Sequence, residues 1–377
     1  MKNTTFILLI SLLAILQKSQ AQCPAGDLIL QNQAQINYFV EQCPDVDTIQ
    51  GALIIGDLNS NITDITGLIS IKVVTGGLTV QHNDSLRSLN GLDSLGFIGE
   101  WLNISKNKLL ESLDHLEEIT TLNSSIFISD NDELSHLTGL QNINSFDGDL
   151  TITKNDNLLN INGLSNIQEA FGNVRIHDNM SLSTIGGLNL LKSIQGDLTI
   201  QSNEALKNVD GLDSLESIGN HCSISYNPSL SDLNAFAKLS SIGGDLFIGS
   251  NSSLSNCTGI CGLINNNEIA GSIAIGDNLS NCLNNSVLIP YCQTVPTLSV
   301  ANPEIKVFPN PTHQYLTPRE HLPEKIQKVS ISSLSGKIIR SQENKNNLLD
   351  ISDLSSGMYI LAVHTKNQVY FQKFVVN

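Results

Sequence analysis

Three aspartates at matching positions are the residues of this chain whose type and spacing could support catalysis. Asp149, Asp197 and Asp245 are spaced two 24-residue units apart. Glycoside hydrolysis uses two carboxylates, which lie no more than about 9.5 Å apart even in inverting enzymes. If each unit is one coil with a strand, two coils separate neighbouring aspartates by about 10 Å. The spacing is too wide, and the preference of Asp for turns explains these positions equally well.

Other catalytic signatures are missing from the sequence. It contains no recognisable Ser-His-Asp arrangement, no phosphate-binding loop and no Cys/His spacing typical of a metal site. We therefore expect neither an enzyme nor a bound cofactor or metal. A carbohydrate-active enzyme of the parallel β-helix type stays as the alternative, because carboxylates are present.

A second set of side chains could bind a ligand. Some of them lie at the strand positions whose side chains should face solvent, and others lie just before a repeated Asn. Thr, Ser, Asp and Asn are the usual residues at both kinds of position. Exposed aromatic side chains often mark a contact surface, whereas scattered surface aromatics and histidines without a role are also common. The candidates are Trp101, Phe127, Arg175, His177, His221, Tyr226 and Phe247.

Six of the seven cysteines lie near the two ends of the repeated region. In an exported chain, such positions predict disulfides that close the ends. Cys23 and Cys43 form the natural first pair, whereas Cys257, Cys261, Cys282 and Cys292 allow three pairings. Cys222 takes an inward apolar position and is expected to be a buried free thiol. A metal site shared with His221 is the alternative, although neighbouring strand residues point to opposite faces.

A period of 24 residues supplies the framework that positions all these side chains. Before each repeated Asn, two apolar residues alternate with outward residues, as in Leu78 and Val80 or Leu198 and Ile200, which predicts a short strand with one buried face. Each unit is therefore one coil of a parallel β-solenoid of about ten coils. An inward amide at the corner can bond to backbone groups that the turn leaves unpaired. The ladder is predicted at Asn59, Asn83, Asn107, Asn131, Asn155, Asn179, Asn203, Asn227 and Asn251.

The ends of the chain have a different composition. Residues 1–21 read as a signal peptide, with an apolar run and a small-residue cleavage pattern. Residues 22–50 form an N-terminal cap with a predicted helix over residues 33–42 and Asn32 as its N-cap. The solenoid covers residues 51–292. Residues 293–301 form a linker, and residues 302–377 form a separate domain. Asn-x-Ser/Thr triplets beginning at Asn103, Asn179 and Asn251 follow from an Asn ladder in Ser-rich sequence, so we do not expect glycosylation.

Charge limits the possible partners. Residues 22–301 hold 9 basic and 30 acidic residues, a net charge of −21, whereas residues 302–377 hold 9 basic and 6 acidic residues, a net of +3. A solenoid this acidic would repel a phosphate backbone. Nucleic acid is therefore excluded as a partner.

Residues 23–292 resemble the receptor L-domain family of leucine-rich-repeat-like solenoids. The resemblance rests on the opening Cys23-Pro-Ala-Gly-Asp-Leu28, the short helix before Cys43, the strand Gly51-Ala-Leu-Ile-Ile55 and the 24-residue units. It implies a solenoid with one strand per coil and a role in recognition. The last coil departs from the pattern, because the stretch from Ile275 to Cys282 is two residues shorter than that from Ile248 to Cys257.

Residues 302–377 resemble the C-terminal sorting domain of type IX secretion substrates. The motifs are Val307-Phe-Pro-Asn-Pro311, Ser335-Gly-Lys337, Gly357-Met-Tyr359 and the closing Lys373-Phe-Val-Val376, among short β-rich runs. The resemblance implies an address that directs the protein across an outer membrane and is then removed. The alternative is an ordinary small β-sandwich.

The sequence thus predicts a mainly β, exported protein at the cell surface or in the medium. Its solenoid would bind a protein or glycan in recognition or adhesion, and its tail would engage the secretion machinery. A passive spacer without a ligand is the further alternative. The sequence alone does not name the ligand.

Overall fold

The structure is a computed structural model that describes residues 23–294, 306–308, 315–319, 326–333, 338–343, 349–365 and 369–376. The predicted signal peptide lies outside these residues, as does most of the predicted linker. The chain divides into two compact units, residues 1–291 and 292–377.

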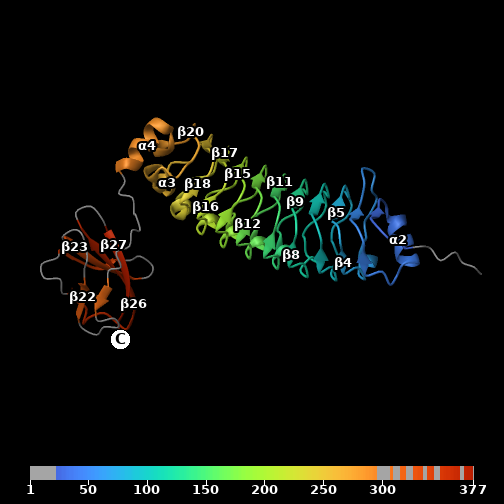
Figure 1. Cartoon of the computed structure of the whole chain (residues 1–377), viewed down its shortest axis with the longest axis horizontal. Coiled ribbons are helices and arrows are strands. Elements are labelled where there is room, and N and C mark those ends of the chain that lie inside the picture. Colours follow the sequence, from blue (N-terminus) through green and yellow to red (C-terminus); the bar gives the residue numbers. More distant parts are fainter. Residues whose placement is uncertain are drawn as a thin grey trace, which may run out of the picture. The chain divides into compact units, whose positions relative to one another are not determined.

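The first unit is a solenoid whose coils contribute one strand each to a long parallel sheet, in chain order (Figure 1). Leu102 pairs with Ile126 and Ile104 with Ile128, so each inward residue meets its counterpart 24 positions later. The strands are β1 (Leu28–Leu30), β3 (Leu53–Ile55), β5 (Leu78–Gln81), β7 (Leu102–Ser105), β9 (Ile126–Ser129), β11 (Leu150–Thr153), β13 (Val174–His177), β15 (Leu198–Gln201), β17 (Cys222–Ser225), β19 (Leu246–Gly249) and β20 (Ile273–Gly276).

Two shorter parallel sheets line another side of the solenoid. The first contains β2 (Thr48–Ile49), β4 (Val73–Val74), β6 (Phe97–Ile98), β8 (Thr121–Leu122) and β10 (Ser145–Phe146). The second contains β12 (Glu169–Ala170), β14 (Ser193–Ile194), β16 (Ser217–Ile218) and β18 (Ser241–Ile242).

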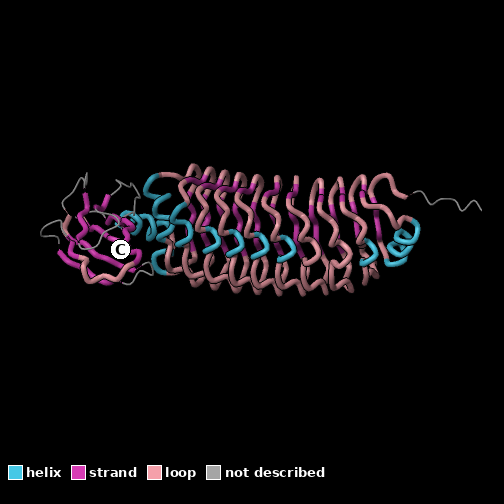
Figure 2. Tube along the Cα trace, turned by 90° about the horizontal axis from the view of Figure 1, so that it is seen from below, coloured by secondary structure: helices cyan, strands magenta, loops and turns pink. Residues whose placement is uncertain are grey.

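Single 3₁₀ turns complete most coils and stack in a row (Figure 2). They are η1 (Thr66–Leu68), η2 (Thr138–Leu140), η3 (Asn162–Leu164), η4 (Gly186–Leu188), η5 (Asp210–Leu212), η6 (Asn234–Lys238), η7 (Thr258–Ile260) and η8 (Ser280–Cys282). The coils approach closely here: a Cβ on Gly187 would lie 1.9 Å from the carbonyl oxygen of Ile161. This position therefore requires glycine.

The interior consists of stacked Leu, Ile and Val side chains with a buried column of asparagines beside them. The backbone N–H and Nδ2 of Asn155 both donate to Oδ1 of Asn179, at 3.1 and 3.3 Å. Nδ2 of Asn155 also donates to the carbonyls of Ile128 and Thr153. The same bonds link successive rungs from Asn83 to Asn278, confirming that the ladder holds the coils together.

The prediction that Asn59 is a rung is wrong. The coil that begins at β3 has 25 residues, since Leu53 pairs with Leu78, and Asn59 is exposed. Its place is taken by Ser60, whose hydroxyl donates to Oδ1 of Asn83 at 2.6 Å. At the other end, the last coil has 27 residues, because Leu246 pairs with Ile273, and Asn278 is a rung that the strict period misses.

Both ends of the solenoid carry helices and disulfides, as the positions of the cysteines predicted. Helix α2 (Gln33–Gln42) begins at the predicted N-cap, where Oδ1 of Asn32 accepts from the backbone N–H of Gln35. Cys23 and Cys43 are disulfide-bonded. The C-terminal end carries α3 (Cys261–Asn266) and α4 (Asn285–Thr294).

The pairing that the sequence left open is resolved at the C-terminal end. Cys257 pairs with Cys282, and Cys261 and Cys292 are also disulfide-bonded. Cys222 is a buried free thiol, and its burial raises the thiol pKa to about 12.

The second unit contains two small antiparallel sheets. One has β21 (Lys306–Phe308), β22 (Tyr315–Arg319) and β25 (Leu349–Asp350); the other has β23 (Lys328–Ser333), β24 (Ile338–Glu343), β26 (Gly357–His364) and β27 (Val369–Val376). Its buried core includes Ile331, Leu361 and Phe374, and the ring of Tyr359 stacks on Phe374. The chain is thus mainly β in both units.

Candidate functional site

The seven candidate binding residues do not form one patch. Phe127, Arg175 and Phe247 share one outward row of the long sheet, but two coils separate the first two and three coils the last two. At about 4.8 Å per strand, Phe247 lies about 24 Å from Phe127. The sheet face therefore offers separated side chains rather than a continuous surface of the predicted kind.

Trp101 packs against the preceding coil. A Cβ on Gly77 would lie 2.2 Å from Cε2 of the indole, so the ring fills the space left by that glycine. The indole N–H donates to the hydroxyl of Thr79 at 3.1 Å, and 37% of the residue stays exposed. These contacts give Trp101 a structural role in joining two coils.

A second ladder runs along the corner that precedes the strands, which we call the corner ladder. At each step a side chain accepts a hydrogen bond from the backbone N–H of the residue 24 positions later. Asp149 accepts from Asn173 at 2.8 Å, Asp197 from His221 at 3.1 Å, and His221 Nδ1 from Asp245 at 2.9 Å. Nδ1 of His221 must therefore be unprotonated in this arrangement.

The corner ladder explains the three aspartates that first suggested catalysis. Each carboxylate accepts a backbone hydrogen bond from the next coil, so its orientation is fixed by the scaffold. Burial raises the pKa of Asp149, but hydrogen bonds from Asn173 and the Arg175 guanidinium outweigh it and hold the pKa below its usual value. Hydrogen bonds from the backbone and hydroxyl of Ser272 likewise lower the pKa of Asp245.

Two further candidates are held by neighbouring side chains. The guanidinium of Arg175 lies 2.7 Å from Oδ2 of Asp149. Nδ1 of His177 lies 2.8 Å from Oδ2 of Asp178 and 3.0 Å from the hydroxyl of Thr153. Arg175 and His177 are thus fixed on strand β13, two residues apart.

The residues just before the Asn rungs adopt a left-handed backbone conformation, which is uncommon for residues other than Gly, Asn, Asp and His. From His82 to Asp277 this column has φ between 53° and 58°, the left-handed region that suits Gly, Asn and Asp. Tyr226, with φ of 55°, is the bulkiest member. Of this residue, 57% is exposed.

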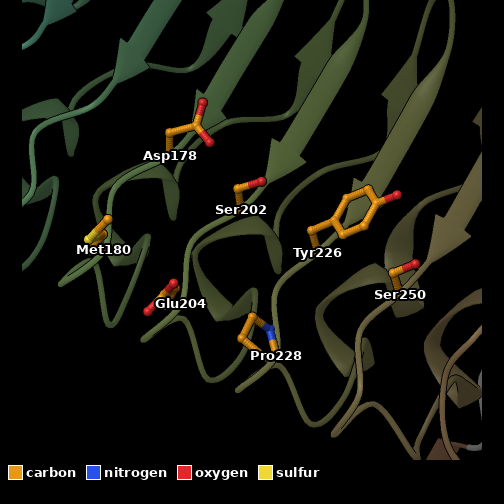
Figure 3. A pocket seen from close by; sticks show the side chains of 7 residues that line it. All are labelled: Asp178, Met180, Ser202, Glu204, Tyr226, Pro228 and Ser250. Carbon is orange, nitrogen blue, oxygen red and sulfur yellow. The ribbon is translucent and has the colours of Figure 1, made fainter.

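A hollow of about 360 Å³ lies beside Tyr226, and we call it the edge groove. Figure 3 shows its side chains in two rows, one at the strand ends and one on the following turn. The first row belongs to the left-handed column, and the second follows the Asn rungs by one residue. The lining residues are Asp178, Met180, Ser202, Glu204, Tyr226, Pro228 and Ser250.

The edge groove combines apolar surface with negative charge. Met180 is 54% exposed, and with Pro228 and the Tyr226 ring it forms the apolar part. Asp178 and Glu204 contribute carboxylates. Burial raises the pKa of nearby Asp156, and the carboxylates of Asp132, Asp130, Asp178 and Glu204 raise it further.

Of the predicted binding residues, the edge groove includes Tyr226 alone. Sequence analysis missed Met180 and Pro228, although a signal was present. The residue after the Asn is charged in most coils, as in Asp84, Lys108 and Glu204, so Met180 and Pro228 interrupt a recognisable column.

Among the described residues, no helix is long and apolar enough to cross a bilayer. No curated protein matches the chain. The model of the secretion system C-terminal sorting domain matches residues 306–377, which confirms the resemblance of the tail. Such a domain interacts with the type IX secretion machinery and marks proteins sent to the cell surface or the medium. Residues 306–377 are therefore a type IX sorting domain, and the chain is an exported protein.

Proposed function

We propose that this exported chain is a recognition or adhesion protein whose receptor L-domain-like solenoid binds a protein or glycan partner. The proposal rests on the edge groove, where four adjacent coils supply a concave surface with apolar and charged parts. The scaffold itself is accounted for by the two ladders. The groove residues contribute to neither ladder through their side chains.

The observation that carries the proposal is the conformation of Tyr226. A left-handed backbone costs an L-residue about 1–2 kcal/mol, and Asn or Asp at this position lowers the cost. The same column contains Asp130, Asp178 and Asp277, so the fold accepts such residues. An exposed aromatic ring in a strained position is therefore better explained by a contact with a ligand than by stability.

The charge of the groove favours a particular partner chemistry. Asp178 and Glu204 face the hollow beside an aromatic ring, an arrangement suited to a Lys or Arg side chain that places its stem on Met180 and its cation near the carboxylates. A neutral glycan would stack on the ring and donate hydroxyl hydrogen bonds to the carboxylates, but it would gain no ion pair. We therefore favour a basic segment of a partner protein over a glycan.

Binding of the chain to arrays of basic peptides, acidic peptides and neutral glycans tests the proposal. Tyr226→Asn should reduce binding by about tenfold, corresponding to the loss of one ring contact, while unfolding stability stays equal or rises. His82→Asn is the matched control, because His82 lies in the same left-handed column six coils away. Equal loss with both variants, or no binding by the wild type, would contradict the proposal and favour a passive spacer.

The absence of catalysis is part of the same proposal. It is supported by the corner ladder, which gives Asp149, Asp197 and Asp245 a structural use. Polysaccharide cleavage that disappears in Asp149→Ala or Asp197→Ala would support the parallel β-helix enzyme instead. Folding of both variants must be verified by circular dichroism.

The receptor L-domain assignment and removal of the tail are also proposals. A sorting domain acts as an address, so the mature surface protein should lack residues 302–377. Mass spectrometry of the protein recovered from the cell surface measures this directly. Mature protein that retains the tail would contradict removal while leaving export intact.

A further inference from the structure

Four outward side chains form a square on the long sheet. Trp101, just before β7, and Asn103 on β7 lie two residues apart on one face, and Ser125 and Phe127 lie at the matching positions of the β9 coil. Asn103 is opposite Phe127 in the strand register, which places Trp101 opposite Ser125. The aromatic residues therefore occupy one diagonal of the square and the polar residues the other. We call these four residues the sheet platform.

The indole ring of Trp101 is held flat on the sheet. A Cβ on Gly77 would lie 2.2, 2.3 and 2.5 Å from the ring atoms Cε2, Cδ2 and Nε1, so a face of the ring, rather than its edge, covers that glycine. The hydrogen bond from the indole N–H to Thr79 fixes the ring further. The other face of the ring is directed outward, since 37% of Trp101 is exposed, and Phe127 is 39% exposed. The platform thus presents aromatic surface in a fixed orientation.

The polar diagonal has hydrogen-bonding capacity that the protein does not use. Oδ1 of Asn103 is buried and has no hydrogen-bond partner in the described part of the chain. Buried polar atoms are nearly always paired, so this oxygen requires an explanation. The hydroxyl of Ser125 accepts from the backbone N–H of Asp149 at 3.0 Å, a bond that uses a lone pair and not the hydroxyl hydrogen. An acceptor and a donor therefore lie beside the two rings.

The platform and the positions around it are uncharged. Asp, Glu, Lys, Arg and His are all missing from the outward positions of β5, β7 and β9 and from the residue before each strand. On the next coil the carboxylate of Asp149 is already paired with Arg175. Residues 22–301 carry a net charge of −21, so an uncharged area of this size is a departure from the rest of the solenoid. A charged ligand would find no counter-charge here, which favours a neutral ligand. The uncharged positions are Gly77, Thr79, Gln81, Trp101, Asn103, Ser105, Ser125, Phe127 and Ser129.

The position of the platform within the sheet argues against a peptide as the ligand. Proteins bind peptide main chains at free strand edges or in grooves. Strand β7 pairs with β5 on one side and β9 on the other, so its backbone groups are used within the sheet. A sugar ring needs neither an edge nor a groove. Its C–H face stacks on a flat aromatic ring, while the hydroxyls around its rim donate and accept hydrogen bonds.

We propose that the sheet platform binds a neutral polysaccharide, with sugar rings stacked on Trp101 and Phe127. A ligand hydroxyl donates to Oδ1 of Asn103 after the side-chain amide turns toward the ligand, and the hydroxyl of Ser125 donates to a ligand oxygen. The site is separate from the edge groove, which is formed by later coils at the ends of their strands. The solenoid therefore has a second site, for a second class of ligand.

Affinity electrophoresis of the full chain tests the proposal. The gels contain neutral glucan, mannan or xylan, with acidic polygalacturonate and cationic chitosan for comparison. At least one neutral polysaccharide should retard the chain, and neither charged one should do so more strongly. Because Trp101 is the single Trp, its fluorescence should change saturably when oligosaccharides of the retarding polysaccharide are added.

Two variants that keep Trp101 identify the site. Phe127→Ala should weaken binding about tenfold, through the loss of one ring contact. Asn103→Ala should weaken binding by a similar factor, while unfolding stability stays equal or rises because an unpaired buried oxygen is removed. Phe247→Ala is the matched control, since Phe247 occupies the same outward row and is 41% exposed. It should leave binding unchanged.

Three results would overturn the proposal. They are no retardation by any of the neutral polysaccharides, stronger retardation by a charged one, and an equal loss of binding in Phe247→Ala and Phe127→Ala. Circular dichroism must show that each variant is folded. Tyr226→Asn at the edge groove should leave polysaccharide binding at the platform unchanged, and Phe127→Ala should leave binding of basic peptides unchanged. Either proposal can therefore fail alone.

Discussion

The Asn ladder makes a sharp prediction, because two asparagines that share the 24-residue period have different environments. Asn155→Ala removes Oδ1 as the acceptor for the backbone N–H and Nδ2 of Asn131, at 3.2 Å each. It also removes the donors to Ile128, Thr153 and Asn179. The buried N–H of Asn131 then lacks its hydrogen-bond acceptor in the ladder, while Nδ2 of Asn131 keeps the carbonyl of Ile104.

The cost follows from these losses. An unsatisfied buried donor costs about 1–3 kcal/mol, and each lost hydrogen bond about 0.5–1.5 kcal/mol. The carbonyls of Thr153 and Ile128 keep their partners in the sheet, so we count one orphaned donor and one or two lost bonds, a total of about 1.5–6 kcal/mol. Asn59→Ala, at an exposed position outside the ladder, should change stability by less than about 0.5 kcal/mol.

Urea unfolding provides the measurement. Circular dichroism reports the whole solenoid, and fluorescence of Trp101, the single Trp, reports the coils at β5 and β7. Agreement of the two transitions tests whether the coils unfold together. If Asn155→Ala costs no more than Asn59→Ala, the ladder contributes no stability and the reasoning is refuted.

Three further predictions concern single residues. Gly187→Ala should cost more than about 3 kcal/mol or prevent folding, because its Cβ would meet the Ile161 carbonyl. Gly186→Ala should be tolerated, because its Cβ would come no closer than 3.4 Å to a neighbouring atom. Thermal melts compare the two variants. Cys222 should resist alkylation at pH 9 until the protein is unfolded, because its pKa is raised to about 12; labelling of the native protein would contradict this. Asp149→Asn should be less stable than the wild type at pH 7, because the contacts that lower the pKa of Asp149 stabilise the folded protein only while this carboxylate is ionised. The difference in unfolding free energy should shrink as the pH falls below about 3.8. A difference independent of pH would contradict this.

Much of the fold can be predicted from the sequence, because every coil of a solenoid repeats the same local pattern of buried and exposed residues. Alternating residues such as Leu198 and Ile200 define the buried face of each strand, and their recurrence defines the stacking. Asn32 predicts the start of α2, and Cys222 in an inward column predicts a buried thiol. These features depend on residues close in sequence or one period apart.

The binding candidates were harder to assign because their contacts depend on the neighbouring coil. An outward Trp101 has the same pattern whether it is free or covers Gly77, and only the coil beside it decides. Asp149 and His221 likewise gain their role from the next coil's backbone. A departure from the repeat identifies an unusual residue, but not whether that residue contacts a ligand or the scaffold.

The sequence by itself determined the period, the inward columns, the disulfides at both ends and the sorting tail, because each depends on residues that are close in sequence or regularly spaced. Only the tertiary structure decided that Asn59 lies outside the ladder, since one extra residue in the coil that begins at β3 changes which side chain reaches the corner. It also brought Met180, Glu204 and Tyr226 together around one hollow. Their proximity depends on three stacked coils and a left-handed corner, which no single coil can encode.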